Sequence, residues 1–469
     1  MTPPPTANHS YGRLTSDDAL FVVMERVLGV PVTNQFIWRL PAPQNPDKQP
    51  PGQVVDDDSV AELGAALRRG RLGRLVRRSH GPTRDRWVRE PSAGLIRTGL
   101  PTVATGAESQ WIRDQLRLRL DSVTGPAWAL TTAPTADGGR LVSLAFSHVI
   151  ADGQGAITAV LEALRGQETH AALPAGTDTT VGHSLRDAAS LLGDAASSAW
   201  GLLRTNLRSA RSPHRSTTGT PPNSGTHDAA HVSDGTATTG GAQGRLPTIA
   251  VEVDGPRFAA RAAAAGGTSN TLFAAVTLGV LVATGRVGEG DTVPISLPMS
   301  LRGDDDLRAN ATSGATAHVV VSSDRYTDLT PIRAASKAGF QRVSAGEFNS
   351  VDAMARIAQA LPDPVVRRLA GTASTPLCLA SNLGTVDTLF ASLGGSVQGR
   401  VASRSVTIPD DGGSQVRAGG ISAWVTLADT RLSLCFTALD ASLIPDEEHL
   451  ANLVTTELHQ WDIPTERWL

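Results

Sequence analysis

The sequence is poor in the residues that carry redox, metal and membrane chemistry. Its 469 residues include 2 cysteines and 4% aromatic residues, and the formal net charge is −3. Cys378 and Cys435 cannot form a disulfide framework and lack metal-site spacing, so we expect two small buried residues. The near-neutral charge gives no electrostatic reason to expect nucleic-acid binding. No Walker A or dinucleotide glycine fingerprint sits between a strand and a helix, and we predict no metal and no bound cofactor.

Long apolar runs and a secretory leader are also missing. The longest apolar run, Leu272 to Ala283, falls short of the ~20 residues that a bilayer span needs. The segment Met1 to Ser10 is polar and Pro-rich, without the apolar core of a signal peptide. We therefore expect a cytoplasmic protein.

The length favours two or three domains. Strand-like and helix-like patterns alternate in both halves, which predicts a mixed α/β protein. Residues 209–246 are rich in Ser, Thr, Gly and Pro, and that composition predicts a flexible linker or crossover. The predicted organisation is a first half over residues 1–208, this linker, and a second half over residues 247–469.

Residues Val60 to Arg78 have a helical apolar pattern and are predicted as one helix with a very basic second half. Six arginines lie there: Arg68, Arg69, Arg71, Arg74, Arg77 and Arg78. One interpretation is a solvated helical face with the leucines turned inward. The other is a docking patch for an anionic carrier, a nucleotide phosphate or a membrane surface, which would make the protein peripheral to a membrane.

The most informative stretch is a strand, Leu141 to Phe146, followed by His148, Asp152 and Gly153 and then a helix. Histidine has an unperturbed pKa near neutrality, so it can take and return a proton. The helix start aims backbone N–H groups at the same region. Asp152 could cap the helix or reach a cation, and Gly153 permits a close approach. These residues alone fit both a structural histidine and a base in a cleft.

The pattern His148-x-x-x-Asp152-Gly153 resembles the HHxxxDG motif of the CoA- or carrier-dependent acyltransferase superfamily. That superfamily includes chloramphenicol acetyltransferase, nonribosomal peptide condensation domains and bacterial wax ester synthase/diacylglycerol acyltransferases, and the flanks are most similar to the last group. Five segments carry this similarity in the right order: Leu14–Phe21 (LSPLDALF), Pro126–Trp128 (PLW), Gly266–Thr271 (GATVND), Ile295–Arg302 with Asn310 (PVSLR…GN) and Ser381–Gly384 (SNVPG).

The resemblance implies two chloramphenicol-acetyltransferase-like lobes with a central tunnel. His148 would be the general base that deprotonates a hydroxyl or amine acceptor, with a hydroxyl favoured. The acceptor would attack the thioester of an acyl-CoA or an acyl-carrier protein. Asp152 would hold the loop by pairing with Arg302, and Gly153 would keep the tunnel open.

The resemblance also suggests four candidate substrate contacts, Ser147, Trp128, Asn270 and Asn382. Helix capping, with Ser269 and Asn270 as the cap, and turn formation explain the two asparagines equally well.

Three positions depart from the family pattern. Ser147 replaces the first histidine, Ala127 replaces the leucine of PLW, and Thr271 replaces the aspartate of the ND pair. These departures motivate an alternative: a divergent member of the fold that binds ligands without acyl transfer, or that catalyses a cyclisation or condensation in specialised metabolism.

Overall fold

The structure is a computed structural model that describes residues 12–42, 54–79, 83–167, 181–211, 246–303, 306–347, 350–369, 376–407 and 419–468. Most of the predicted linker, residues 212–245, lies outside the described residues, and residues 209–211 end a helix. The division at 209–246 therefore stays a prediction.

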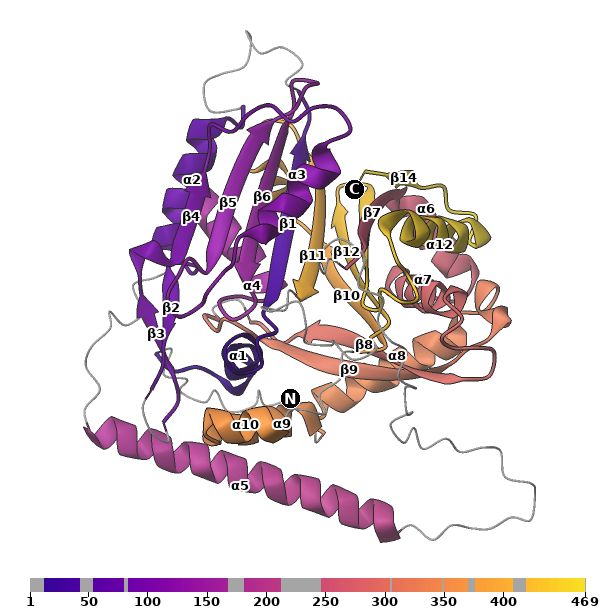
Figure 1. Cartoon of the computed structure of the whole chain (residues 1–469). Coiled ribbons are helices and arrows are strands. Elements are labelled where there is room, and N and C mark those ends of the chain that lie inside the picture. Colours follow the sequence, from indigo (N-terminus) through magenta and orange to yellow (C-terminus); the bar gives the residue numbers. More distant parts are fainter. Residues whose placement is uncertain are drawn as a thin grey trace, which may run out of the picture.

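A five-stranded sheet forms the first half of the molecule (Figure 1). Its order is β11 (Arg400–Thr407), β1 (Val32–Leu40), β6 (Arg140–Ser147), β5 (Trp128–Pro134) and β4 (Gly94–Arg97). β6 is antiparallel to β1, with Ser147 opposite Thr33. The edge strand β11 comes from the second half of the chain and pairs along the whole of β1. The two halves are thus joined by backbone hydrogen bonds as well as by side chains.

A seven-stranded sheet forms the second half. Its order is β14 (Glu466–Arg467), β7 (Thr248–Asp254), β13 (Arg431–Ala438), β12 (Ile421–Ala428), β10 (Cys378–Thr385), β8 (Thr292–Ser300) and β9 (Thr312–Val320). The predicted hairpin around Asp429 is confirmed as β12 and β13. β8 and β9 pair antiparallel and are joined by the connection that carries Arg302 and Asn310. This connection approaches the first half of the molecule.

Twelve α-helices are described. They are α1 (Ser16–Val22), α2 (Asp57–Arg69), α3 (Glu108–Asp114), α4 (Gly153–Leu164), α5 (Val181–Arg211), α6 (Gly255–Ala264), α7 (Ser269–Ala283), α8 (Thr330–Ser344), α9 (Ser350–Ala360), α10 (Asp363–Leu369), α11 (Thr388–Ser392) and α12 (Glu447–Gln460). A π-helix, η1 (Val23–Val27), continues α1 directly.

Helix α7 forms the centre of the second core. Its side chains are buried almost all round, as expected for a helix without a polar face. The predicted cap at Ser269 and Asn270 is wrong, because the Thr268 side chain accepts the Thr271 N–H and both residues lie in the first helical turn. Among the described residues no single helix is long and apolar enough to span a membrane; α6 and α7 reach that threshold only together, across an 87° bend.

The prediction of one helix over Val60–Arg78 is wrong. α2 ends at Arg69, and after a turn the chain forms β2 (Arg74–Arg77), which pairs with β3 (Arg86–Arg89). Arg71 is buried and binds Glu162 at 2.7 Å. Arg74 is buried and donates to Ile150 O at 3.0 Å. Arg78 pairs with Asp85 at 2.9 Å.

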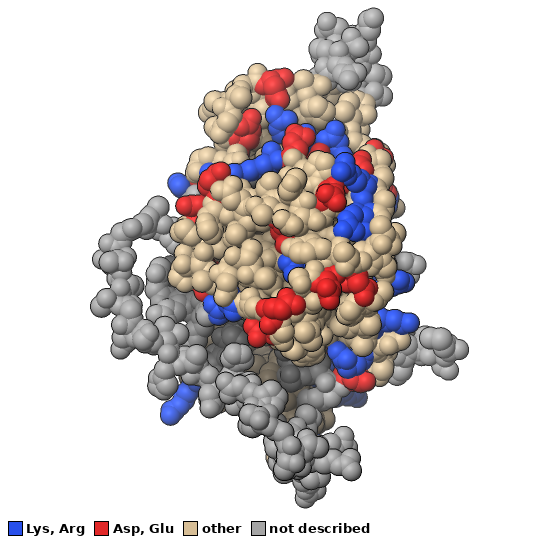
Figure 2. Space-filling model, turned by 90° about the vertical axis from the view of Figure 1, so that its right-hand side faces the viewer, with Lys and Arg blue, Asp and Glu red and all other residues tan. Residues whose placement is uncertain are grey.

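Four of the six arginines therefore have partners within the molecule, since Arg68 also donates to Gly94 O at 3.0 Å. This rules out a continuous basic helical patch over Arg68–Arg78. The face of the second half shown in Figure 2 carries acidic and basic side chains interspersed with each other. Charges arranged in this way cancel within a short distance and set up no field of one sign over that face.

Candidate active site

His148 directly follows β6, and its position is fixed by the sheet. Its backbone N–H donates to Val32 O on β1 at 2.9 Å. The ring stacks on Phe21 of α1, with 3.8 Å between ring centroids and 12° between planes. Nδ1 lies 3.0 Å from Asn310 Oδ1. Elements from the first residues of the fold and from the β8–β9 connection therefore meet at this imidazole.

The electrostatic environment favours the neutral imidazole. Burial lowers the pKa of His148 below its ordinary value of 6.5, because the charged form loses hydration. The negative charge of Asp152 and the contact with Asn310 oppose this effect on the pKa of His148 in part. A histidine with a lowered pKa is deprotonated at neutral pH and can accept a proton.

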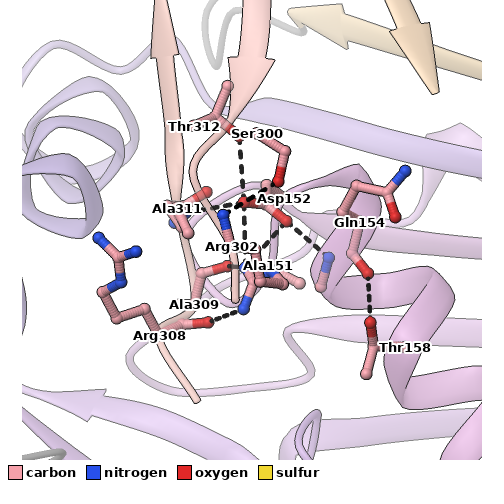
Figure 3. A network of polar contacts seen from close by, with 12 residues as sticks. Ala151, Asp152, Gln154, Thr158, Ser300, Arg302, Arg308, Ala309, Ala311 and Thr312 are labelled. Atoms are coloured by element: carbon pink, nitrogen blue, oxygen red, sulfur yellow. Dashed lines mark hydrogen bonds and ion pairs between the residues drawn. The ribbon is translucent and has the colours of Figure 1, made fainter. Parts of the chain in front are cut away.

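Asp152 has both carboxylate oxygens engaged by other groups (Figure 3). Arg302 Nη2 donates to both oxygens at 3.0 Å. Gly155 N donates to Oδ1 at 2.6 Å, which makes Asp152 the N-cap of α4. Ala311 N and Thr312 Oγ1 donate to Oδ2 at 2.8 and 3.1 Å. The aspartate therefore fastens the motif loop to the β8–β9 connection.

Gly153 of the motif and the nearby Gly155 lie where the start of α4 packs closely against other groups. A Cβ built on Gly153 would lie 2.7 Å from Leu383 Cδ2, and one on Gly155 would lie 3.1 Å from Arg302 Nη2. Both glycines let the start of α4 approach the second half of the molecule closely. Gln154 between them donates to Leu383 O at 2.8 Å.

Ser147 is buried and takes part in a second polar cluster. Its Oγ donates to Glu25 Oε2 at 2.6 Å. The other carboxylate oxygen of Glu25 accepts from Ser122 N at 2.8 Å and from Ser122 Oγ at 2.7 Å. Glu25 lies on η1, one turn after Phe21. This cluster ties η1, and with it the stacked Phe21, to the end of β6.

Asn270 and Asn382 both line a cavity of about 350 Å³. Asn382 Nδ2 donates to Asn270 Oδ1 at 3.3 Å. The cavity is also lined by Gln154, Met299 and Phe340. It therefore lies beside the start of α4, next to the motif loop.

Trp128, the fourth candidate substrate contact, is placed differently. It is fully buried, and its indole N–H donates to Leu72 O at 3.0 Å. The structure thus brings Ser147 and His148 together, and Asn270 and Asn382 together, while Trp128 lies in the core.

The two cysteines are buried free thiols, as expected. Burial raises the pKa of Cys378 and of Cys435 to about 12, so both stay protonated. Within the described ranges, no group of three or more His, Cys, Asp or Glu side chains is arranged to hold a metal ion.

Sequence reasoning left four residues around His148 without a role: Asp18, Phe21, Glu25 and Arg74. Asp18 and Phe21 lie in the segment Leu14–Phe21, which was matched only as a block of residues. Arg74 was placed on a helix. Glu25 had no signal at all, because its partners Ser122 and Ser147 lie about a hundred residues away.

No family model matches the chain, and no curated protein matches it in sequence. Solved structures do match it over nearly its whole length, and they show its fold. The chain has the two-lobed fold of condensation domains, which is the chloramphenicol-acetyltransferase-like fold of CoA-dependent acyltransferases. The predicted mixed α/β fold with two lobes is thereby confirmed; the central tunnel stays a prediction.

Three of these structures illustrate the similarity. The first condensation domain of the calcium-dependent antibiotic synthetase, with a substrate analogue, is 13% identical with a TM-score of 0.56, covering 96% of this chain and 95% of its own. A starter condensation domain of rhizomide synthetase, with C8-CoA and Leu-SNAC, is 11% identical (TM-score 0.52; 96% and 94% covered). The epimerization domain of the third module of tyrocidine synthetase B is 16% identical (TM-score 0.50; 96% and 95% covered).

Proposed function

We propose that this protein is an acyltransferase that moves an acyl group from a thioester to a hydroxyl or amine acceptor, with His148 as general base. One observation carries the proposal. His148 is held at the end of β6 with a lowered pKa, while the neighbouring Asp152 is fully engaged by Arg302 and backbone donors. The base and the carboxylate thus have separate tasks, one chemical and one structural.

The proposed step balances without a covalent enzyme intermediate. His148 takes the proton from the acceptor O–H or N–H as the oxygen or nitrogen attacks the thioester carbonyl carbon. A C–O or C–N bond forms and the C–S bond breaks. The imidazolium then returns the proton to the departing thiolate, so ester or amide and free thiol are the products.

The donor class is proposed from the fold neighbours. A rhizomide synthetase domain of this fold has been solved with C8-CoA and Leu-SNAC. We infer an acyl-CoA or an acyl-carrier thioester as donor for the present chain. The wax ester synthase-like segments around the motif support a hydroxyl acceptor, as a finer proposal. The condensation-domain neighbours would support an amine.

The cavity beside Gln154 is our candidate substrate subsite. Its lining combines Asn270 and Asn382 with the apolar side chains of Met299, Phe340 and Leu297. Such a mixture suits a ligand that has an apolar chain and one amide or hydroxyl group. Its position next to the motif loop places a bound ligand near the start of α4.

The test measures free thiol release from a series of acyl-CoA donors, and from an acylated carrier protein, in the presence of hydroxyl or amine acceptors. Wild type is compared with His148→Ala and with His318→Ala, which removes an exposed histidine on β9. We expect His148→Ala to lower the rate at least 100-fold, because general base catalysis contributes about 10²- to 10⁴-fold.

His318→Ala is expected to keep the wild-type rate. Absence of thiol release with every donor, or full activity in His148→Ala, would reject the proposed function. If no donor releases thiol but ligands still bind, the result would favour the divergent alternative, a member of the fold that does not transfer acyl groups. Mass spectrometry of the product before and after mild alkaline treatment assigns the acceptor, because the treatment hydrolyses an ester and leaves an amide intact.

A further inference from the structure

The side-chain amide of Asn310 has one possible orientation. Its Nδ2 lies 3.1 Å from Asp18 Oδ1, 3.1 Å from His148 O and 3.2 Å from Val149 O. All three partners are oxygen atoms that accept hydrogen bonds. Turning the amide over would place Oδ1 against three acceptors, which costs the hydrogen bonds and adds repulsion. Oδ1 therefore points to His148.

This orientation determines the tautomer of the imidazole. Asn310 Oδ1 can only accept, and it lies 3.0 Å from His148 Nδ1. Nδ1 must therefore carry the hydrogen in the neutral ring, and Nε2 is left with the lone pair. A base needs that lone pair, and the tautomer with hydrogen on Nε2 would have none to offer at this atom.

Asp18 holds Asn310 at two points. Its Oδ1 accepts from the Asn310 backbone N at 3.0 Å as well as from Nδ2. Its Oδ2 accepts from Thr15 N at 3.0 Å, which also completes the N-cap of α1. The carboxyl group is 1% exposed.

Burial raises the pKa of Asp18, while the Thr15 N–H, the charge of Arg74 and the Asn310 side chain lower it. Arg74 is buried in turn, which lowers its pKa to about 10, and the negative charge of Asp18 acts against this shift. The pKa of Asp18 is raised overall, because burial is the largest of these effects, and three N–H donors hold its two oxygens in place.

We propose that Asp18 and Asn310 are positioning residues that lock His148 in the tautomer with the hydrogen on Nδ1 and the lone pair on Nε2. Asp18 acts through Asn310 and does not touch the reacting atoms. When Nε2 takes a proton, Nδ1–H keeps its acceptor and no group has to reorient. The inference rests on the proposed function for its kinetic consequence, and on geometry alone for the tautomer.

The first experiment reads the tautomer directly by ¹⁵N-resolved histidine NMR on the full chain. His148→Ala identifies the signals of His148 among the 11 histidines. We expect the wild type, above the pKa of His148, to show protonated Nδ1 and unprotonated Nε2. In Asn310→Leu we expect a mixture of tautomers, because the acceptor at Nδ1 is lost. In Asp18→Asn we expect a smaller shift in the same direction, because His148 O and Val149 O still accept from Asn310 Nδ2 while the contact with residue 18 is weakened.

Asp17→Asn is the matched control. It neutralises the adjacent carboxylate on the same turn of α1, which makes no hydrogen bond to Asn310, and it should keep the wild-type tautomer. Wild type with hydrogen on Nε2, or Asn310→Leu and Asp18→Asn spectra identical to wild type, would overturn the proposal. If Asn310→Leu does not fold, Asp18→Asn, which keeps size and shape, decides the question.

The second experiment measures kcat/KM against pH for the same variants. Asp18→Asn should lower kcat/KM by about 2- to 10-fold, because the net contribution of one hydrogen bond to the position of Asn310 is lost. Asp18→Asn leaves the other charged groups of the surrounding elements in place: Asp152 at the N-cap of α4, Glu25 on η1, Arg74 on β2 and Arg302. It also leaves Asp17 on α1, whose pKa is raised to about 6 by burial and by the charge of Asp18, so the pH profile of Asp17→Asn is recorded beside it. A merely structural role would lower the folded fraction and leave both the tautomer and the pH profile of the remaining activity unchanged.

The two proposals fail separately. If the wild type transfers no acyl group but shows the Nδ1–H tautomer that the variants lose, the proposed function fails and the positioning role stands. If acyl transfer depends on His148 while Asp18→Asn keeps both tautomer and rate, the positioning role fails and the proposed function stands.

Discussion

Replacing Asp152 by asparagine tests whether the motif aspartate is structural. The carboxylate is 2% exposed and receives hydrogen bonds from Arg302, Gly155, Ala311 and Thr312. Asparagine keeps one acceptor oxygen and adds an N–H₂ group. Because donors surround both oxygen positions, one of them must then face the new N–H₂ group whichever way the amide turns.

The magnitude follows from the charge left behind. The Arg302 side chain is 8% exposed, so its guanidinium would stay buried without a counter-charge in the variant. Breaking a buried ion pair by removing one partner costs about 3–5 kcal/mol. We expect Asp152→Asn to lower the free energy of unfolding by that amount, measured as the urea midpoint followed by tryptophan fluorescence.

Two comparisons make the measurement specific. Glu448→Gln changes the same chemical group in an exposed pair with Arg467 at 3.0 Å, where 75% of the glutamate side chain is exposed; it should cost less than about 1 kcal/mol. The double variant Asp152→Asn with Arg302→Met should be destabilised by about 0.5–3 kcal/mol less than the sum of the single variants, because the pair is coupled. A cost below about 1 kcal/mol for Asp152→Asn, or strict additivity, would refute the structural role.

Three further predictions follow. Burial lowers the pKa of His148 from 6.5, so kcat/KM should rise with pH through an inflection below 6.5, and an inflection above 6.5 contradicts this. Because the unfolded chain binds the proton more tightly, the stability that His148 contributes is fully present above pH 6.5 and is lost as the pH falls from 6.5 through the lower pKa of the folded state. Arg71→Met should lower the free energy of unfolding by about 3–5 kcal/mol, because Arg71 and Glu162 form a buried pair. Arg77→Met, on the exposed side of β2, should change the free energy of unfolding by less than about 0.5 kcal/mol in the same urea assay. Ser147→Ala should cost about 1–3 kcal/mol by leaving Glu25 Oε2 without its donor, and a neutral result in thermal unfolding would show that water replaces the hydroxyl.

Local patterns in the sequence predicted the parts of the fold that depend on neighbouring residues. The hairpin β12–β13, the buried helix α7 and the strand–His148–helix unit were all read from periodicity and turn residues. The prediction for Val60–Arg78 failed because the leucines of this segment fit a helical period while Arg74–Arg77 pair with β3. Six arginines suggested solvent exposure, but long-range acceptors such as Glu162 reverse that expectation.

The candidate site was predictable only where a motif named the residue. His148, Asp152 and Arg302 were identified in this way. In the structure Arg302 binds Asp152, and His148 contacts Asn310 on the same β8–β9 connection that carries Arg302. Asp18 and Glu25 were not identified, because nothing in their local sequence indicates which acidic residue will contact Asn310 or Ser147. The sequence separations are 292 and 122 residues, and only tertiary packing brings these groups together.

The position of Ser147 is explained by what fills the space around it. A histidine in the family pattern stands where this chain has a small hydroxyl, and the buried carboxylate of Glu25 reaches that hydroxyl from η1. Ser147 Oγ also accepts from Val149 N at 3.2 Å, so one oxygen links the carboxylate to the backbone on the far side of His148. A larger side chain at 147 would displace Glu25, and η1 and Phe21 would move with it. Ser147 and Glu25 therefore belong together, and exchanging Ser147 for histidine alone should weaken the stacking on His148, seen as a change in the ring-current shift of its NMR signals.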